Sequence, residues 1–264
     1  MILGIDIGGS FTDMLLYDGK NFFIHSTVPT SMENVKNEIE KIPDVDSIGI
    51  AIAAWLKEGK IMHAPNLPFK EFDLKLDVPY IMENDANCFA YAVSKIFNEK
   101  NLVGITVGTG IGMGIVIDGK IYHGTGLAGE IGHTVIGGDE PCVCGGKGHL
   151  ECYFSGWSIR KRYGKEAKEL FEKNKFPYDE NFEIFCRALA NVTLLFDPSI
   201  IAIGGRIGGR LSKEKLHKIY DFLPSQFQPE IKVIKDDYMV AKGACYMAEE
   251  LNFAGQRNKK LKNR

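Results

Sequence analysis

Four potential metal ligands lie close together in one glycine-rich stretch, residues 129–156. His133, Cys142, Cys144 and His149 have the spacing H-x8-C-x-C-x4-H. Zinc in proteins takes nitrogen and sulfur ligands at the corners of a tetrahedron, and a short loop with this spacing can supply four of them. The glycines before His149 let the backbone turn tightly enough for Cys144 and His149 to meet at one ion. The stretch therefore predicts a structural zinc site.

Cysteine pairs also occur by chance, and a single histidine is usually a surface or core residue. Four candidate ligands in one loop favour the metal site over that interpretation. Cys152 is near enough in the sequence to compete with His149 for the fourth position, and the spacing leaves both open. Glu130 and Glu151 flank the loop and are not needed as ligands. We expect the metal to position polar groups such as these for a substrate.

Two short loops carry backbone amides that could bind phosphate: DIGGS at 6–10 and GTG at 108–110. Successive amides form a concave anion site, and glycine lets the anion approach the chain. Neither loop matches the P-loop pattern or a G-x-G-x-x-G that opens a helix. Most glycine pairs are only turns, but recurrence in two equivalent places favours phosphate binding. Asp6 ends a buried strand, and burying its charge without a partner would cost free energy. Mg²⁺ accompanying the phosphates is the natural partner.

A further carboxylate, Asp85, directly follows an apolar strand at the start of a predicted helix. Aspartate at such a position commonly caps the helix. If Asn84 caps instead, Asp85 is left to accept a proton from a substrate hydroxyl. A carboxylate is the usual base when an alcohol attacks a γ-phosphoryl group.

The elements that must position these residues occur in a repeated order: strand, glycine loop, strand, Asp-Gly turn, strand. This order begins at Ile2 and again at Leu102, which predicts two halves of like topology. Between and after them we expect strands and helices in alternation. The predicted strands are 2–7, 14–17, 22–26, 47–54, 78–82, 103–107, 113–117, 121–122, 200–203 and 231–234; the predicted helices are 32–42 with Ser31 as N-cap, one from Asn84 or Asp85, 156–173, 181–196, 211–222 and 240–251, and 57–70 is expected to be a loop.

The bulk composition is that of a globular protein of one large or two smaller domains. The 264 residues are 45% hydrophobic and carry a net charge of −2, so we expect neither a nucleic-acid nor a membrane partner. The basic residues 256–264 are expected to form a solvated, frayed end. No apolar run is long enough to span a membrane, and the N-terminal residues do not resemble a signal peptide. The remaining cysteines, Cys88, Cys186 and Cys245, lie in apolar helical contexts, which favours a reducing, cytoplasmic setting.

Taken together, these motifs resemble the ROK family of sugar kinases along essentially the whole chain. The matching segments are DIGGS (6–10), ENDAN (83–87), VGTGIGMGIVIDGKIYHG (107–124), GEIGH (129–133), CVCGGKGHLE (142–151), DPSIIAIGGR (197–206) and KGACYMAEEL (242–251). The resemblance implies an α/β protein with the two-lobed actin-like ATPase (ribonuclease H-like) fold. Each lobe would hold a mixed sheet flanked by helices, with the ligand cleft between the lobes. We expect residues 1–100 and a closing helix at about 240–255 in the N-terminal lobe, and 101–239 with the zinc loop in the C-terminal lobe.

The same resemblance implies roles for individual residues. Asp85 would be the general base, and Asp6 would help to hold Mg²⁺. His133 would use one ring nitrogen on zinc and the other on the sugar, which makes the zinc a device for orienting the substrate site. The sugar-binding set is expected to be Asn66, Asn84, Asp85, Glu130, His133 and Glu151; the ATP-binding set is Asp6, Gly8, Gly9, Ser10, Thr12, Gly108, Thr109 and Gly110 at the phosphates with Gly204 and Gly205 at the adenosine; and the zinc ligands are His133, Cys142, Cys144 and His149.

The chain departs from the family pattern at three places. His149 stands where the family usually has a third cysteine, Ser10-Phe11 replaces the frequent Thr-Lys, and Ala53-Ala54 stands where many members have Gly-Pro beside the sugar. We expect an ATP-dependent hexokinase or glucokinase that phosphorylates the 6-hydroxyl of a hexose such as glucose. An N-acetylmannosamine or N-acetylglucosamine kinase is the alternative, followed by a non-catalytic sugar-binding regulator. Family members are often dimers, so a homodimer is expected. ROK repressors carry an N-terminal helix-turn-helix, and this chain starts at the first strand, which disfavours that role.

Overall fold

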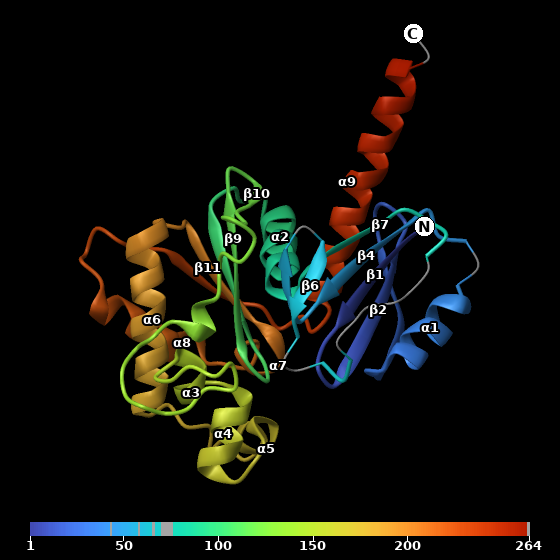
Figure 1. The fold of residues 1–264 in the computed structure, drawn as a ribbon. Coiled ribbons are helices and arrows are strands. Elements are labelled where there is room, and N and C mark those ends of the chain that lie inside the picture. Colours follow the sequence, from blue (N-terminus) through green and yellow to red (C-terminus); the bar gives the residue numbers. More distant parts are fainter. Residues whose placement is uncertain (43, 58, 65–66, 70–75, 263–264) are drawn as a thin grey trace. The chain divides into compact units, whose positions relative to one another are not determined.

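Two five-stranded sheets with the same strand order form the framework of the protein (Figure 1). Its structure, a computed structural model, describes residues 1–42, 44–57, 59–64, 67–69 and 76–262. The first sheet has the order β3-β2-β1-β4-β7 and the second has the order β10-β9-β8-β11-β12. The strands are β1 (Ile2–Ile7), β2 (Phe11–Tyr17), β3 (Phe22–Pro29), β4 (Ser47–Ile52) and β7 (Tyr80–Asn84), then β8 (Leu102–Val107), β9 (Ile111–Ile117), β10 (Lys120–Ile121), β11 (Ile200–Gly204) and β12 (Glu230–Val233).

Strand directions match as well as strand order. In each sheet the first strand pairs antiparallel with its hairpin partner and parallel with the strand on its other side. The turns of the outer hairpins use residues with positive φ, Gly19 in the first sheet and Asp118 with Gly119 in the second. Both turns lie at the predicted Asp-Gly pairs, so the expected repeat of one topology is confirmed.

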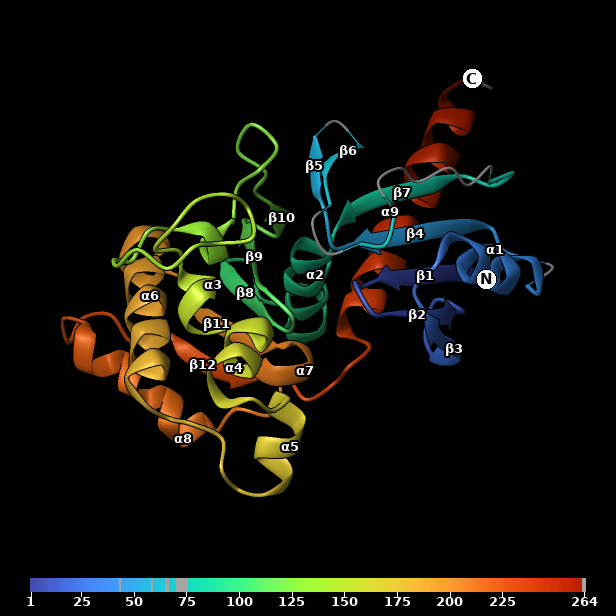
Figure 2. The same cartoon turned by 60° about the horizontal axis from the view of Figure 1, so that its bottom comes forward.

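Opposite faces of the first sheet carry different helices. Leu3, Ile5 and Ile7 of β1 share a buried cluster with Val35 of α1 (Met32–Glu40). Ile2 lies in a second cluster with Ala241 and Cys245 of α9 (Met239–Lys262). Because successive side chains of a strand point to opposite faces, α1 and α9 cover the two sides of this sheet, as Figures 1 and 2 also show.

Glycines let α9 approach the first sheet closely. A Cβ on Gly49 of β4 would collide with the backbone carbonyl of Ala244. Backbone atoms cannot rotate aside as a side chain can, so we expect Gly49→Ala to lower the free energy of unfolding by about 3 kcal/mol, the upper end for overpacking. Denaturant unfolding would measure this loss.

The control for that variant is Gly119→Ala. Gly119 has a φ of +75°, and the nearest atom to a Cβ added there would be the Lys100 Cγ at 3.9 Å, so alanine introduces backbone strain without a clash. About 1 kcal/mol is expected for strain alone. Equal losses for the two variants would show that α9 does not pack against β4 in this way.

The second sheet is covered by most of the remaining helices. Its buried cluster includes Val103 and Ile105 of β8, Ile201 of β11, and Phe185 and Leu189 of α6. Besides α1 and α9, the helices are α2 (Asp85–Phe97), η1 (Ile131–His133), α3 (Leu150–Tyr153), α4 (Gly156–Tyr163), α5 (Ala167–Glu172), α6 (Glu180–Phe196), α7 (Gly205–Gly208), α8 (Lys213–Leu216) and η2 (His217–Phe222) in the described residues.

By contacts, the chain divides into two compact units. Unit 1 comprises Met1–Lys95, Gly124–Leu127 and Tyr238–Arg264, and unit 2 comprises Ile96–His123 and Ala128–Asp237. Among the helices in the described residues, none combines the length and apolarity needed to cross a bilayer.

Several elements differ from the predictions. The stretch 57–70 was expected to be a loop, but β5 (Trp55–Lys57) and β6 (Lys60–His63) form a hairpin there. The helix predicted at 156–173 is two helices, because Gly164 ends α4 in the left-handed conformation. Residues 211–222 form a short α-helix followed by a 3-10 helix. Helix α9 continues to Lys262, through much of the stretch expected to be frayed.

Other local predictions are confirmed. Ser31 caps α1, because its hydroxyl accepts a hydrogen bond from the Asn34 N–H at 3.1 Å. Cys88, Cys186 and Cys245 are fully buried on helices as free thiols.

Candidate active site and metal centre

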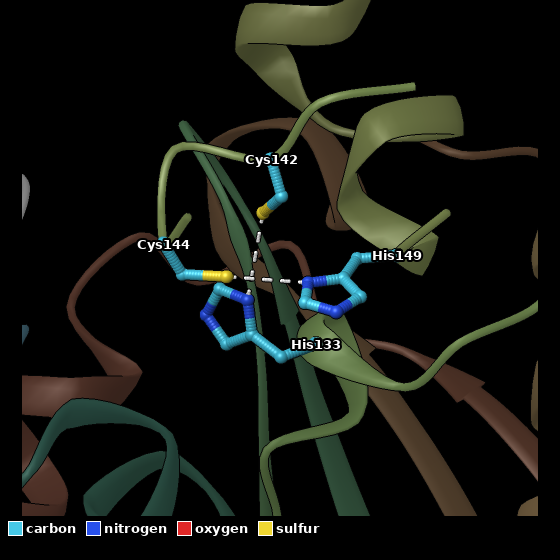
Figure 3. A group of neighbouring side chains, drawn as sticks. All are labelled: His133, Cys142, Cys144 and His149. Carbon is cyan, nitrogen blue, oxygen red and sulfur yellow. Dashed lines mark hydrogen bonds between the residues drawn. The ribbon is translucent and has the colours of Figure 1, made fainter. Parts of the chain in front are cut away.

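The four predicted metal ligands converge in unit 2. Figure 3 shows His133, Cys142, Cys144 and His149 pointing toward one another, and their ligand atoms all lie within 4.8 Å of one another. The Cys142 Sγ is 3.7 Å from the His133 Nδ1, and the Cys144 Sγ is 3.3 Å from the His149 Nδ1. In a tetrahedral zinc site with Zn–S near 2.3 Å and Zn–N near 2.0 Å, neighbouring ligands are about 3.4 to 3.8 Å apart. The donor atoms therefore fit zinc in chemistry, and the two His–Cys distances of 3.7 and 3.3 Å are close to the spacing of a zinc site.

Tight turns bring these ligands together. A Cβ on Gly146 would lie 2.7 Å from the His149 Nε2, so only glycine leaves room for the imidazole. Gly148 has a φ of +67° and is packed against the carbonyls of Gly137 and Gly138. These contacts explain the density of glycines in the loop: one makes space for a ligand and the other makes the turn.

Electrostatics also favour a cation at this group. Burial, with the nearby Glu151 carboxylate adding to it, raises the pKa of the Cys142 thiol. Cys142 would form a thiolate only with a positive charge beside it, and a divalent metal supplies that charge.

Of the two candidates for the fourth ligand, His149 belongs to the converging group. The Cys152 Sγ lies beside the group: it donates to the Glu140 carbonyl at 3.6 Å and also forms a hydrogen bond with the Cys142 thiol. The resulting set has two thiols and two imidazoles.

Glu151 lies beside the metal group rather than in it. Its Oε1 is 3.3 Å from the Cys142 Sγ and 4.0 Å from the His133 Nδ1, and its side chain is buried. Its Oε2 would lie 2.9 Å from a Cβ on Gly110. Glu151 therefore connects the metal group to the second glycine loop.

The first glycine loop, in unit 1, uses the Gly8 amide within its own turn: this N–H donates to the Phe11 carbonyl at 3.1 Å. Thr30, just beyond β3, binds the loop from outside. Its hydroxyl donates to the Gly8 carbonyl at 2.7 Å, and its N–H donates to the Ser10 carbonyl at 3.0 Å. Thr12, predicted at the phosphates, is fully buried with its Oγ1 3.0 Å from the Thr30 Oγ1.

The second glycine loop, in unit 2, is built in the same way. The Gly108 N–H donates to the Gly110 carbonyl at 3.0 Å, inside the loop. The Gly108 and Thr109 carbonyls accept from the N–H groups of Gly156 and Trp157 at 2.8 and 3.2 Å. Those two amides open α4, whose start is fixed by a Ser155–Ser158 capping box. In both loops, therefore, the first glycine's N–H stays inside the turn and its carbonyl is held from outside.

Gly204 and Gly205 lie next to this second loop. Gly204 pairs with Thr106 across the strands, and Gly205, at a φ of +84°, would place a Cβ 2.8 Å from the Val107 carbonyl. The chain beyond them lines a hollow of about 670 Å³, together with α5 and the residues after β12. Unit 2 thus brings the second glycine loop and the predicted adenosine residues together around the ends of β8 and β11.

Asp85 is the first residue of α2, and Asn84 is the residue that caps the helix. The Asn84 Oδ1 accepts from the N–H groups of Ala86 and Asn87 at 2.9 and 3.2 Å, and its Nδ2 donates to the Ala54 carbonyl at 3.2 Å. The Asp85 carboxylate accepts from the Ala86 N–H at 2.9 Å. Burial raises the pKa of Asp85 from 3.8 to about 6, although that hydrogen bond lowers it.

A row of side chains crosses the first sheet and ends at this helix. Asp13, Asp6, Ala51 and Glu83 are paired in register across β2, β1, β4 and β7, so they point to one face. The Glu83 Oε1 accepts from the Asn84 N–H at 2.8 Å and from the Asn87 Nδ2 at 3.0 Å. Glu83 and Asp13 were missed from the sequence. Asp13 lies just before the predicted strand 14–17, and the register of the β1–β2 hairpin places it opposite Asp6.

The remaining predicted substrate contacts have different surroundings. Glu130 is half-buried at the start of η1, the turn that carries His133. Gly129 before it has a φ of +99° and packs on the Met113 carbonyl. Asn66 lies outside the described residues.

The solved structures that this fold is similar to include ROK family proteins. A ROK family glucokinase from Streptomyces griseus, solved with glucose and AMPPNP, superposes with a TM-score of 0.82 at 23% identity, over 94% of this chain and 99% of that one. This likeness confirms the predicted actin-like ATPase fold with its two mixed sheets.

Curated relatives include kinases and repressors. A glucokinase of Pyrobaculum calidifontis is 28% identical over 78% of this chain and 79% of its own length. An N-acetyl-D-glucosamine kinase of Haemophilus influenzae is 26% identical over 88% of this chain and 90% of its own length. A xylose repressor of Bacillus subtilis is 29% identical over 64% of this chain and 51% of its own length. The ROK family model matches residues 2–233, and the chain therefore belongs to the ROK family.

Proposed function

We propose that this protein is an ATP-dependent sugar kinase that transfers the γ-phosphate to the 6-hydroxyl of a hexose such as glucose. The observation that carries the proposal is that Asn84 and Asp85 have different roles at the start of α2. Asn84 caps the helix, while Asp85 has a raised pKa and a carboxylate that accepts hydrogen bonds from the backbone N–H groups of Ala86 and of Asp85 itself. A base with a pKa near 6 is ionised at neutral pH and is still basic enough to take a proton in the transition state.

In the proposed reaction, Asp85 accepts the proton of the sugar hydroxyl as that oxygen attacks the γ-phosphorus. The amides of the two glycine loops would bind the phosphate oxygens. Asp6 would hold Mg²⁺, which would neutralise charge on the transferring phosphoryl group. Closure over the substrates would exclude water and limit ATP hydrolysis.

The hollow beyond Gly205 supports a nucleoside subsite in unit 2. Its lining combines Phe171 with the cationic Arg210, Lys213 and Lys235, and Arg210 is 3.7 Å from Asp237. An aromatic ring and cations are suited to a purine and its attached phosphates. Its volume lies within the usual range for small-molecule sites.

The proposed sugar site would use the groups positioned by the metal loop, Glu130, His133 and Glu151. Cys142 and Cys144 as thiolates, with the two histidines, would hold zinc. The ring of His133, fixed by that bond at one nitrogen, could turn its other nitrogen toward a sugar hydroxyl. The relatives named glucokinase and N-acetyl-D-glucosamine kinase make the N-acylated hexosamines the second substrate class. Ala53-Ala54, in place of the family's frequent Gly-Pro, is the feature of this chain that bears on that choice.

A coupled ADP-release assay tests the proposal across glucose, mannose, fructose, glucosamine, N-acetylglucosamine and N-acetylmannosamine. Turnover with a free hexose at least tenfold above the N-acylated sugars is expected. Preference for an N-acylated sugar would replace the substrate class and keep the chemistry. Binding of a sugar with no ADP release in the presence of any of the six sugars would show a regulator, as the repressor relatives suggest, and would overturn the kinase proposal.

We also propose that the protein is a homodimer in a reducing, cytoplasmic setting.

The pH dependence of the reaction follows from the raised pKa of Asp85. Since the ionised carboxylate is the active form, kcat/KM should rise about tenfold per pH unit below pH 6 and level off above it. A pH-rate profile between pH 4.5 and 8, with the coupling enzymes in excess, measures this. A flat profile through pH 6 would contradict the assignment of the base.

A further inference from the structure

We propose that Thr30 is a positioning residue of the nucleotide site, setting the direction of the Gly9 amide so that it can bind a phosphate oxygen. This inference rests on the proposed function, because it concerns the ATP phosphates. Thr30 lies outside every motif that the sequence analysis identified. Its hydroxyl donates to the Gly8 carbonyl at 2.7 Å, and its own N–H donates to the Ser10 carbonyl at 3.0 Å.

The first step concerns the planarity of the peptide bond. In a trans peptide the carbonyl of one residue and the N–H of the next point in opposite directions. The Gly8 carbonyl is held toward Thr30, so the Gly9 N–H points away from Thr30. The Gly8 N–H is bonded to the Phe11 carbonyl at 3.1 Å and cannot serve a ligand. Gly9 therefore supplies the amide of this loop that Thr30 directs.

The second step concerns the direction of the neighbouring hydrogen bond. The Thr30 hydroxyl has one hydrogen, which goes to the Gly8 carbonyl, so in the 3.0 Å contact with Thr12 the Thr12 hydroxyl must donate. The chain of bonds thus runs from Thr12 to Thr30 to Gly8. Consecutive hydrogen bonds of this kind strengthen one another. The fully buried Thr12 would act on the loop through Thr30 and not on the nucleotide directly.

The third step is the likeness to unit 2. There the Gly108 carbonyl is held by the Gly156 N–H at 2.8 Å, an amide at the start of α4. The Thr30 hydroxyl binds the Gly8 carbonyl as the backbone N–H of Gly156 binds the Gly108 carbonyl. In both loops, therefore, a hydrogen bond to the carbonyl of the first glycine sets the direction of the next amide. Only in unit 1 is the donor a side chain, so only there can a substitution remove it without changing the backbone.

The test compares nucleotide binding by four variants, measured by calorimetry with Mg·ADP in the absence of sugar. Thr30→Val removes the hydroxyl at nearly constant shape, and the Kd should rise about tenfold because a directed carbonyl loses its donor. Thr12→Val should raise the Kd about threefold, since it weakens the same chain indirectly. Thr30→Ser keeps the hydroxyl and should restore the wild-type Kd to within about twofold.

The matched control is Thr193→Val in unit 2. Thr193 is fully buried, and its hydroxyl donates to the Leu189 carbonyl at 2.9 Å inside α6. It should lower the melting temperature much as Thr30→Val does and leave the Kd unchanged. If Thr30→Val lowers stability but binds Mg·ADP like the wild type, Thr30 only fastens β3 and the proposal is wrong.

The same data separate this proposal from the kinase proposal. Nucleotide binding that depends on Thr30, without phosphorylation of any sugar, supports the positioning role and removes the proposed enzyme. A wild-type protein that binds no Mg·ADP overturns both. Should Thr30→Val fail to fold, the contrast between Thr12→Val and Thr30→Ser decides: equal Kd values for these two variants would contradict the chain of bonds.

Discussion

Asp85→Asn should abolish phosphoryl transfer while leaving sugar binding intact. The substitution keeps the shape of the side chain and the acceptor for the Ala86 N–H, but removes the group that takes the proton. A loss of about a thousandfold or more in kcat is expected for a missing general base. Single-turnover assays measure the chemical step, and calorimetric titration with the sugar checks that binding remains within about threefold of wild type.

The stability of this variant distinguishes a base from a helix cap. The raised folded-state pKa of Asp85 means that its ionisation opposes folding. Its contribution to stability is lost as the pH rises from about 4 to 6. At pH 7 asparagine should therefore stabilise the protein by on the order of 1 kcal/mol, after discounting for the solvent contact that the half-buried side chain keeps. A capping role predicts almost unchanged stability with retained activity, because asparagine caps a helix as well as aspartate does.

Asp179→Asn provides the comparison. Asp179 caps α6 through the N–H groups of Asn181 and Phe182, at 3.0 and 3.4 Å. Asparagine also caps helices well, so this change at a helix start should leave turnover unaffected. Turnover by Asp85→Asn within tenfold of wild type would remove the proposed mechanism.

Replacing both Cys142 and Cys144 by serine should abolish stoichiometric zinc binding and destabilise unit 2. Two of the four converging ligands would be lost, and hydroxyls are poor ligands for zinc. Because the free energy of metal binding is available only to the folded loop, a fall in melting temperature on the order of 10 °C is expected. Metal analysis by mass spectrometry and thermal unfolding with and without a chelator measure the two effects.

Single variants assign the fourth ligand. His149→Ala should lose most of the bound zinc, whereas Cys152→Ser should keep it, since the Cys152 thiol lies at the Glu140 carbonyl. Zinc content unchanged by the double serine variant would show that the metal does not bind at this group. Zinc lost from Cys152→Ser but kept by His149→Ala would make Cys152 the fourth ligand.

Much of the fold could be predicted from the sequence because the signals were local. The repeat of strand, glycine loop and strand, with Asp-Gly turns of positive φ, fixes the hairpins of both sheets. The C-x-C spacing and its glycines likewise fix the metal group, apart from the choice between His149 and Cys152. That choice depended on the direction in which α3 carries Cys152, which spacing cannot give.

The missed features depend on contacts between distant segments. Thr30 acts on Gly8 across 22 residues, and Glu83 joins the row of Asp6 only through the pairing of three strands. The α4 helix reaches the carbonyl of Gly108 from 48 residues away, because 156 − 108 = 48. The hairpin of β5 and β6 was missed because the glycines and prolines near it suggested an irregular loop. The prediction of Thr12 as a phosphate ligand overlooked that its side chain faces the core.

The placement of α9 has a consequence for biosynthesis. This helix covers β1 and β4 of the first sheet, yet it follows unit 2 in the sequence and is translated after it. As the chain leaves the ribosome from its N-terminus, all of unit 2 has been synthesised once Asp237 has emerged. The apolar side chains of β1 and β4 that contact α9 are then still exposed. The nascent chain would then carry one uncovered face of the first sheet until α9 has been synthesised, and we expect it to bind chaperones that act on emerging chains.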